Sequence, residues 1–319
     1  MQDIPFSKVY DVENENDLDK ILLFGRAINS PTRIEIIKML NKKQMTLTDI
    51  ANALNIPISS ASVHTQILLD AELIQIDYST KKKGHIKYHG YAFNKCVILN
   101  LREYFGHGDD YTSYEYKLPI GDYIDIKVGK RSGAATGKEE ISECDAFVGM
   151  EFDARRRDTQ ILYTDEGYVV YAIPNAFAKH GEIKRVELKL EICSEANGYN
   201  ETYESDISFT INGKRVCTYT SPGDFGARYG KYTPAWWFKE STKYGLLITI
   251  AVTDGGVWLN GELVNKAVTL KDLDLAAGNK ITLRIGVEDD AKHKGGFNLF
   301  GEKFGDYDIP IVFTAYFNK

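Results

Sequence analysis

Residues 55–75 read NIPISSASVHTQILLDAELIQ, and this stretch decides the fold of the first part of the chain. Apolar and small residues recur in it at helical spacing, which predicts a helix that begins at Pro57 or Ile58. One face of that helix consists of Ile58, Ala61, Thr65 and Leu68. The other face carries short hydroxyl side chains, and residues 44–80 contain no Lys or Arg. Any attraction of this helix to a polyanion must therefore come from the segments that flank it.

Amphipathic helices also precede this stretch, from Leu18 onward. Ser30 and Pro31 form a helix start signal, because a serine can cap free N–H groups and a proline at the first helical position loses no hydrogen bond. A second start signal lies at Thr46 and Asp49, whose spacing of three predicts a reciprocal capping pair. The quoted helix is thus the last of a helical series.

The periodicity changes from helical to two after Leu73. Residues 73–79 and 85–93 are predicted strands, and residues 80–84, TKKKG, are a basic turn between them. Helices followed by a basic β-hairpin predict a winged helix-turn-helix domain, which we place at residues 17–95.

Strand signals dominate the rest of the chain, where β-rich segments alternate with Gly, Asn and Asp turns. Asn212–Gly213 and Asn260–Gly261 are the strongest hairpin signals, and only residues 269–276 suggest a helical turn. We expect residues 112–319 to form an antiparallel, jelly-roll-like β-sandwich, joined to the winged domain by a connector at residues 96–111. The predicted fold class is α+β with two domains.

Composition supports this division. A length of 319 residues suits two domains, and 43% hydrophobic with 26% charged residues is typical of a globular protein. The sequence has neither a secretion signal nor a run of about 18 apolar residues, which predicts a cytoplasmic protein without a membrane partner. The four cysteines form no CxxC pair, so we expect buried thiols rather than disulfides or a zinc site. They are Cys96, Cys144, Cys193 and Cys217.

The net charge of −6 hides an asymmetry between the two predicted domains. Residues 17–95 contain eleven Lys and Arg against seven Asp and Glu, so this segment is basic while the remainder is acidic. Contact with a polyanion is therefore expected of the winged domain only.

The first domain resembles the ArsR-type winged-helix regulators of bacteria. The resemblance is carried by residues 27–40, AINSPTRIEIIKML, by residues 47–74, LTDIANALNIPISSASVHTQILLDAELI, and by the Gly-tipped wing that ends in tyrosine. It implies a homodimer that binds double-stranded DNA, with residues 17–28 pairing across the two-fold axis and the third helix in the major groove. Base edges and phosphates would then be met by Ser59, Ser60, Ser62, Val63 and Gln66.

Attraction to phosphate is assigned to basic residues on either side of the uncharged segment. Those expected to contact DNA are Arg33, Lys42 and Lys43 before it and Lys81, Lys82 and Lys83 after it. The alternative for Lys81–Lys83 is a solvated turn that protects the hairpin tip from aggregation.

No cofactor or metal site is expected. The helix at residues 46–54 lacks the cysteines through which well-known ArsR-type proteins sense metals. His64, His85 and His89 are assigned structural or wing roles. Calcium at residues 286–296 or 305–308 is a further alternative, because both segments cluster carboxylates.

The second domain resembles a C-terminal extension of some ArsR-type regulators of Gram-positive bacteria, which implies a regulatory role without naming a ligand. Its aromatic and polar residues favour a small-molecule effector, with a carbohydrate as one candidate, because rings stack on sugar C–H faces while polar groups bind hydroxyls. Trp236 and Trp237 are expected to point in opposite directions, one buried and one exposed. Candidate ligand residues are Glu195, Asn200, Asp206, Asp224, Arg228, Trp236, Trp237, Trp258, His293 and Asn298.

Two other functions remain open, as does a β domain that binds nothing. A glycan-active enzyme would need paired carboxylates, and Asp206, Asp224, Glu240 and Asp254 show no diagnostic spacing. No phosphate loop, serine nucleophile elbow or HExxH motif occurs, so we do not expect an enzyme. A protein-interaction module is the other alternative, because the acidic residues of the helix-turn-helix, such as Asp49 and Asp70, could repel DNA.

Overall fold

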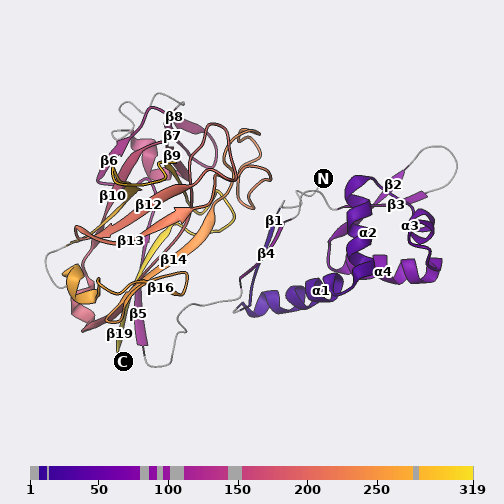
Figure 1. Ribbon diagram of the computed structural model, residues 1–319, viewed down its shortest axis with the longest axis horizontal. Coiled ribbons are helices and arrows are strands. Elements are labelled where there is room, and N and C mark those ends of the chain that lie inside the picture. The colour runs from indigo at the N-terminus through magenta and orange to yellow at the C-terminus, as the bar shows by residue number, and fades with distance from the viewer. Residues whose placement is uncertain are drawn as a thin grey trace. The chain divides into compact units, whose positions relative to one another are not determined.

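A computed structural model of the chain describes residues 7–12, 14–79, 86–91, 96–100, 111–142, 153–275 and 280–318 (Figure 1). The chain divides into two compact units, residues 1–103 and residues 104–319, here called the winged unit and the β unit. The winged unit holds the α-helices, whereas the regular elements described in the β unit are strands and short 3-10 helices. The fold is α+β, with a winged helix-turn-helix followed by an antiparallel β-sandwich.

The helices of the winged unit follow one another closely along the chain. They are η1 (Glu15–Asp17), α1 (Leu18–Ile28), α2 (Pro31–Lys42), α3 (Leu47–Leu54) and α4 (Ile58–Asp70). The turn between α3 and α4 contains Asn55 in the left-handed conformation, with φ of 51°, which ends α3 sharply. The wing follows as β2 (Ile74–Ser79) and β3 (Ile86–Tyr91), an antiparallel pair.

The helix start signals are confirmed in position, but only one of them in its interactions. The Asp49 backbone N–H donates to Thr46 Oγ1 at 3.2 Å, and the Thr46 N–H donates to Asp49 Oδ2 at 3.1 Å, so α3 has the predicted capping pair. Helix α2 begins at Pro31 as predicted, yet the Ser30 side chain makes no capping hydrogen bond. Helix α2 therefore begins at Pro31 without a side-chain cap from Ser30.

The helical core of the winged unit is built from small and branched residues. Ile36, Ile50, Ala61 and Leu68 are fully buried, so the inward face predicted for α4 is confirmed from its second turn onward. Ile58, which we predicted on that face, is instead 52% exposed. It is the first residue of α4 and lies at the open end of the helix, where the helical core does not cover it.

Two strands lie outside the domain limits predicted from the sequence. Strands β1 (Ser7–Asp11) and β4 (Cys96–Asn100) pair in parallel, and β4 occupies the start of the predicted connector 96–111. Val97 packs against the helical core. The winged unit therefore extends beyond residues 17–95 in both directions, because strands far apart in sequence meet there and neither carries a local signal of its partner.

The β unit consists of two antiparallel sheets. Its strands are β5 (Tyr111–Leu118), β6 (Asp125–Val128), β7 (Ser132–Ala135), β8 (Glu140–Ser142), β9 (Ile161–Thr164), β10 (Gly167–Pro174), β11 (Ile183–Cys193), β12 (Ser205–Ile211), β13 (Lys214–Ser221), β14 (Leu246–Thr253), β15 (Gly256–Leu259), β16 (Glu262–Asn265), β17 (Lys280–Val287), β18 (Phe297–Phe300) and β19 (Ile311–Asn318). Short 3-10 helices occur at η3 (Ala154–Asp158), η4 (Phe177–His180) and η5 (Leu270–Leu273), the last in the predicted helical turn.

The smaller sheet has the order β13-β12-β17-β10-β6, and the larger sheet divides at β11. One edge of β11 pairs with β14, which continues to β15 and β16. The other edge is shared: β19 pairs with residues 183–189 and leads to β5, whereas β18 pairs with Ile192 and Cys193 and leads to β9, β7 and β8. The long loops 194–204 and 222–245 begin beside this fork and shape that end of the sandwich.

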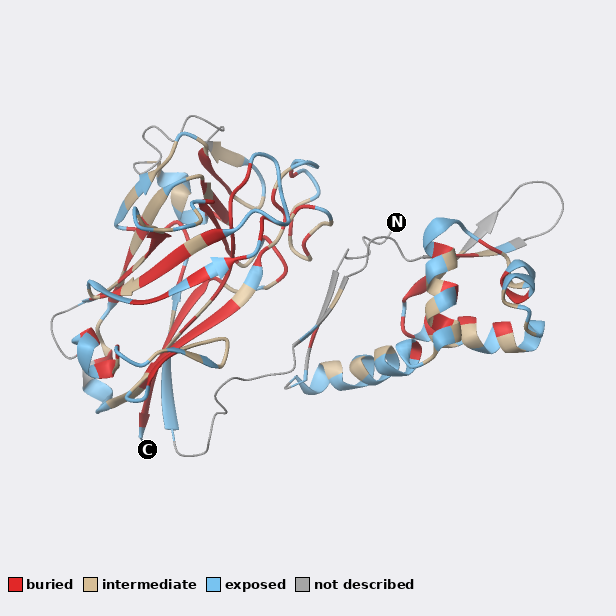
Figure 2. Cartoon of the chain, viewed as in Figure 1, coloured by how far each residue is buried: buried red, intermediate tan, exposed pale blue. Residues whose placement is uncertain are grey.

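The core of the β unit lies between the two sheets. Tyr171, Phe209 and Leu283 of the smaller sheet form one apolar cluster with Leu188 and Phe313 of the larger sheet, all of them 1% exposed or less. Figure 2 shows buried residues concentrated along the strands and exposed residues on the connecting loops. The interior is thus closed by side chains, and a ligand must bind at a surface or between loops.

Both predicted hairpin turns are confirmed. Asn212 and Gly213 have φ of 47° and 79°, and Asn260 and Gly261 have φ of 49° and 80°, as a two-residue turn of type I′ requires. No strand is predicted from the sequence at β5, β7, β8 or β18, which the structure forms. Strand β7, for example, reads SGAA and is buried throughout, so it shows no alternation. The sequence also predicts a strand at residues 145–152, DAFVGMEF, and this segment lies outside the described residues.

Candidate DNA-binding surface and candidate effector site

The outward face of α4 presents the residues that the sequence predicts to read DNA. Ser59, Ser62, Val63 and Gln66 are exposed, Val63 to 60% of its surface, while Ser60 is half-buried. Gln66 Nε2 donates to Asp70 Oδ1 at 2.8 Å, which holds the amide along the helix. This face can offer hydroxyl groups, an amide oxygen and methyl groups to a groove, but no positive charge.

Arg33 does not lie on this surface, which corrects the prediction that it contacts DNA. Its side chain is buried, with Nε donating to the carbonyl of Ala27 at 2.8 Å and Nη2 to those of Arg26 at 2.7 Å and Asn29 at 3.2 Å. These carbonyls belong to the end of α1, where helical carbonyls lack intrahelical partners. Arg33 therefore caps α1 and joins it to α2.

Of the other basic residues predicted to contact phosphate, two are exposed and three lie outside the described residues. Lys42 and Lys43 are exposed at the end of α2, and none of the described carboxylates forms an ion pair with either. Lys81, Lys82 and Lys83 lie outside the described residues, as does His85. Lys42 and Lys43 are thus the predicted phosphate contacts that the structure exposes.

His64 and His89 contact other elements of the winged unit. His64 Nδ1 lies 3.5 Å from Arg33 Nη1. The backbone of His89 on β3 exchanges hydrogen bonds of 2.8 and 2.9 Å with that of Met45, and burial lowers the pKa of its imidazole. These contacts are those of structural residues.

Helix α1 carries an exposed apolar stripe. Leu18 and Leu22 are 52% and 62% exposed, and a side chain at Gly25, one turn further, would meet nothing within 4 Å. Leu23 and Ile28 are exposed as well. Figure 2 shows exposed and half-buried residues along most of this helix. Apolar residues spaced at i, i+4 and i+7 and left open to solvent are typical of a helix that packs against a partner.

Two of the predicted ligand residues in the β unit are buried together. Asn298, fully buried, donates from Nδ2 to Glu195 Oε2 at 2.8 Å and to the Ser194 carbonyl at 2.7 Å. Burial, together with the nearby Asp224 carboxylate, raises the pKa of Glu195 well above its ordinary value. Asn298 therefore ties β18 to the loop after β11, which corrects the expectation that it faces a ligand.

Asp224, in the loop 222–245, is a buried carboxylate close to Glu195. Its Oδ2 accepts the Ala196 N–H at 2.9 Å, and its backbone N–H donates to the Asn200 carbonyl at 2.9 Å. Burial raises the pKa of the Asp224 carboxyl to about 7. Asn200 remains exposed, where its Oδ1 accepts hydrogen bonds from the backbone and hydroxyl of Thr202.

Asp206 and His293 also meet, and they stabilise the loop before β18. Asp206 Oδ2 accepts the His293 N–H at 2.9 Å, and Oδ1 lies 3.2 Å from His293 Nδ1. Partial burial acts to raise the pKa of Asp206, but the hydrogen bonds from His293 and Thr220 lower it overall. Glu204 lies 3.2 Å from the other ring nitrogen of His293.

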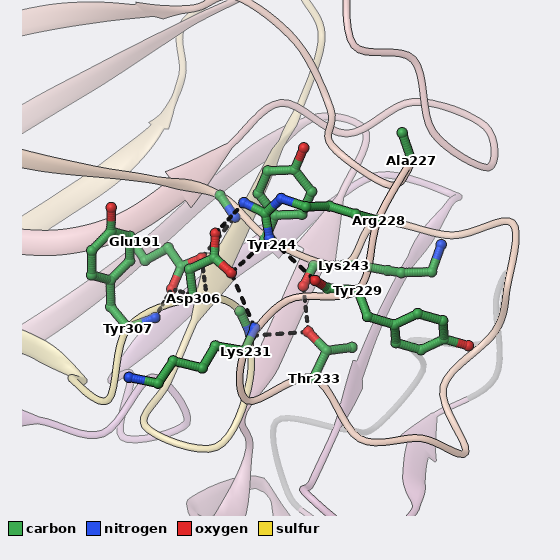
Figure 3. Close-up of polar contacts among 12 residues, drawn as sticks. Glu191, Ala227, Arg228, Tyr229, Lys231, Thr233, Lys243, Tyr244, Asp306 and Tyr307 are labelled. Carbon is green, nitrogen blue, oxygen red and sulfur yellow. Dashed lines mark hydrogen bonds and ion pairs between the residues drawn. The ribbon is translucent and has the colours of Figure 1, made fainter. Parts of the chain in front are cut away.

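Arg228 belongs to a buried network that fastens two loops, residues 222–245 and residues 301–310, to β11 (Figure 3). Its guanidinium forms a two-pronged ion pair with Asp306 and lies 3.5 Å from the centre of the Tyr244 ring. Glu191 on β11 accepts the backbone N–H groups of Gly245, Asp306 and Tyr307 at 2.8 to 3.0 Å. Because Arg228 is occupied in this way, it acts as a structural residue of the β unit.

One of the two adjacent tryptophans is buried and the other is exposed, as predicted, but the alternation of a strand is not the cause. Trp237 is 4% exposed and Trp236 is 39% exposed, although both lie in a turn rather than on a strand. Trp237 Nε1 donates to the Thr242 carbonyl at 2.7 Å, and its ring packs edge-on against Phe304. Trp258 is half-buried on β15, with Nε1 3.3 Å from Thr253 Oγ1.

A cavity of about 630 Å³ lies beside Trp236. It is lined by the β7–β8 turn Thr136–Glu139, Arg155, Asp158, Gln160, Tyr232, Pro234 and Lys303. Trp236 Nε1 donates to the Gly137 carbonyl at 3.1 Å and so joins the loop 232–236 to that turn. No sequence signal marked these residues, because they come from four separate segments that only the folded β unit brings together.

Comparison with known proteins assigns the winged unit. Residues 30–75 match the model of the bacterial regulatory proteins of the arsR family. The transcriptional repressor SdpR of Bacillus subtilis (strain 168) is 40% identical over 73 residues, which cover 23% of this chain and 74% of SdpR. The chain belongs to the arsR family of bacterial regulatory proteins. The resemblance stated from residues 27–74 is confirmed, and this arsR-family protein is a transcriptional regulator with a DNA-binding domain.

Two solved structures are similar to separate parts of the arsR-family protein. NolR from Sinorhizobium fredii is 21% identical, covers 29% of this chain and 82% of its own, and superposes with a TM-score of 0.22. The carbohydrate-binding module CBM36 in complex with calcium and xylotriose is 9% identical, covers 65% of this chain and 99% of its own, and has a TM-score of 0.26. Both TM-scores fall below 0.5, so neither likeness assigns a ligand to this chain.

The described residues of the arsR-family protein show no group of three or more His, Cys, Asp and Glu side chains arranged to hold a metal ion. In the calcium candidate at residues 305–308, Asp306 already pairs with Arg228. Cys193 and Cys217 are buried free thiols, and burial raises the pKa of Cys217 to about 12. None of the described helices is long and apolar enough to cross a membrane.

Proposed function

We propose that this arsR-family regulator binds double-stranded DNA as a homodimer through α4 and the wing, and that its β unit receives a small-molecule signal. The observation that carries the proposal is the exposed polar and methyl-bearing face of α4, the second helix of a helix-turn-helix whose first helix, α3, has its capping pair. Ser59, Ser62 and Val63 would contact base edges, and the valine methyl groups suit the methyl group of thymine.

Phosphate attraction is assigned to residues outside α4. Lys42 and Lys43 end α2 without described carboxylate partners, and the wing lysines Lys81–Lys83 would add to them. Because phosphate contacts position a protein while base contacts specify sequence, a recognition helix without charge is compatible with DNA binding.

The dimer is assigned to the stripe on α1. Leu18, Leu22 and Gly25 leave an apolar surface that a second α1 would cover, and Gly25 allows the two helices to approach closely. Two winged units linked in this way bind a palindromic site together, which multiplies affinity without a new DNA contact.

The β unit is proposed to bind its ligand rather than to convert it. Of the carboxylates considered for glycan cleavage, Asp206 is occupied by His293 and Thr220, and Asp224 is buried. Ligand binding would change DNA affinity by as much as the ligand's affinity differs between the DNA-binding and the released state of the dimer.

Fluorescence anisotropy tests the DNA-binding proposal. The full chain is titrated with the DNA upstream of its own gene and with scrambled DNA, at low and physiological salt. We expect preferential, salt-dependent binding that the triple variant S59A/S62A/V63A loses at least tenfold, with V264A, a change at an exposed valine of β16, as the control. Equal weak binding to both DNAs would contradict the proposal and would favour a protein-interaction module.

A further inference from the structure

We infer that the cavity beside Trp236 is a binding site for a neutral oligosaccharide. The inference rests on the proposed sensing role of the β unit, and it adds the location of the site and the chemical class of its ligand. The site lies apart from the predicted ligand residues Glu195 and Asn298, whose side chains are held inside the protein.

Backbone hydrogen bonds fix the walls of the cavity. In the turn, Thr136 N–H donates to the Glu139 carbonyl at 2.8 Å. The side-chain oxygen of Gln160 accepts the Lys303 N–H at 2.8 Å. Tyr232 N–H donates to the Gly305 carbonyl at 2.8 Å. The backbone around the cavity is therefore held in position before a ligand binds, which reduces the entropic cost of binding.

The charges at the cavity are mixed and balanced. Lys138, Arg155 and Lys303 line the cavity together with Glu139 and Asp158, and Arg155 forms ion pairs with Asp153 at 2.7 Å and with Glu139 at 3.9 Å. Counted with Asp153, the positive and negative charges are equal in number. An anionic ligand gains no net attraction from such a set, whereas sugar hydroxyls can donate to the carboxylates and accept from the ammonium groups at the same time.

The apolar side of the cavity is aromatic. Tyr232 and Pro234 line it, and Trp236, which is 39% exposed, lies next to the lining residue Gly137, to whose carbonyl its Nε1 donates. The Trp236 ring is held by its hydrogen bond to Gly137 and by edge-on packing against Trp237, with ring centres 5.6 Å apart and planes at 79°. A rigid, half-exposed indole beside hydrogen-bonding groups suits the apolar C–H face of a pyranose ring.

The volume also suits an oligosaccharide. About 630 Å³ falls within the roughly 300–1,000 Å³ of small-molecule sites. The cavity draws on the β7–β8 turn, η3, the loop 232–236 and Lys303, so a ligand there would bridge segments that lie far apart in the sequence. This bridging is a route by which binding could alter the β unit.

Isothermal titration calorimetry of the full chain tests the inference. The probes are maltotriose, cellotriose and xylotriose, with glucose 6-phosphate as the anionic comparison. We expect at least one neutral trisaccharide to bind, and W236A and D158N each to weaken that binding at least tenfold. The controls are F238A, at an exposed phenylalanine two residues away, and D308N, at an exposed aspartate, neither of which lines the cavity. Both should bind within twofold of the unaltered chain.

Three results would overturn the inference: no heat with any trisaccharide up to millimolar concentration, binding of glucose 6-phosphate alone, or binding that W236A and D158N leave unchanged. D158N alters one oxygen-bearing group without removing volume, so it keeps the test informative if W236A fails to fold. DNA anisotropy of the same samples separates the two proposals. DNA binding without sugar binding rejects the sugar site alone, whereas sugar binding that leaves DNA affinity unchanged supports the site and rejects the sensing role.

Discussion

Arg33 Nε donates a hydrogen bond of 2.8 Å to the carbonyl oxygen of Ala27. With the carbonyls of Arg26 and Asn29, this contact closes the end of α1 on the start of α2. Because α1 also carries the exposed leucines, Arg33 sets the direction in which the apolar stripe leaves the helical core. Arg33, whose charge and position in the sequence suggested a DNA contact, thus supports the proposed dimer surface instead.

Replacing Arg33 with alanine should therefore reduce stability rather than phosphate contact. We expect R33A to lower the free energy of unfolding of the winged unit by about 1–3 kcal/mol, because the buried carbonyl of Ala27 and the partly buried carbonyls of Arg26 and Asn29 lose their donor. The dependence of DNA affinity on salt should keep its slope, whereas K42A should reduce the slope by about one unit. Chemical denaturation and anisotropy at several salt concentrations measure both effects. Unchanged stability with a reduced slope would show that Arg33 contacts phosphate.

Replacing Leu22 with glutamate should dissociate the proposed dimer. Leu22 is 62% exposed in the single chain, and a carboxylate there would be buried against the second α1 without a partner. Sedimentation equilibrium should show L22E as a monomer, with DNA affinity lower by roughly 100-fold because the two winged units no longer bind together. V264E, at a valine of β16 that is 47% exposed, should leave both properties unchanged. A dimeric L22E would place the interface elsewhere.

The buried ion pair of the β unit should be sensitive to loss of one member. R228A leaves the Asp306 carboxylate, which is fully buried, without its guanidinium, and we expect a loss of about 3–5 kcal/mol in the free energy of unfolding. R215A is the matched control, since the Arg215–Asp290 pair is exposed on both sides and should contribute less than about 1 kcal/mol. Urea denaturation of the full chain, followed by tryptophan fluorescence, distinguishes the two. Equal losses would contradict the role assigned to the network in Figure 3.

Asp224 should make the stability of the β unit fall as the pH rises. Burial raises the pKa of its carboxyl to about 7, above the value of about 3.9 in an unfolded chain. The folded state therefore holds this proton more tightly, and the stabilisation is complete below about pH 4 and lost as the pH rises through 7. The shift corresponds to an upper limit of about 4 kcal/mol.

D224N removes this titration while keeping the size of the side chain. We expect D224N to match the unaltered protein at pH 4 and to exceed its free energy of unfolding at pH 8. Because Glu191 titrates in both proteins, the difference between the two pH profiles reports Asp224 together with its effect on the neighbouring Glu195. A difference that does not change between pH 4 and pH 8 would rule out the raised pKa.

Local features of the fold follow from the sequence alone, because they depend on neighbouring residues. Helical spacing around residues 55–75, the Thr46–Asp49 capping pair and the Asn–Gly turns are local, because a side chain interacts there with backbone only a few residues away. The ArsR-type resemblance rested on the same local order of helices and wing.

Features that join distant segments depend on how the whole chain packs. It paired β1 with β4, turned Arg33 away from the DNA-binding face, buried Asn298 against Glu195, and assembled the cavity from the β7–β8 turn, η3, loop 232–236 and Lys303. Each of these depends on which groups remain exposed or lose water when the chain packs. That outcome is set by the two sheets and the helical core as wholes, and no single stretch of sequence contains it.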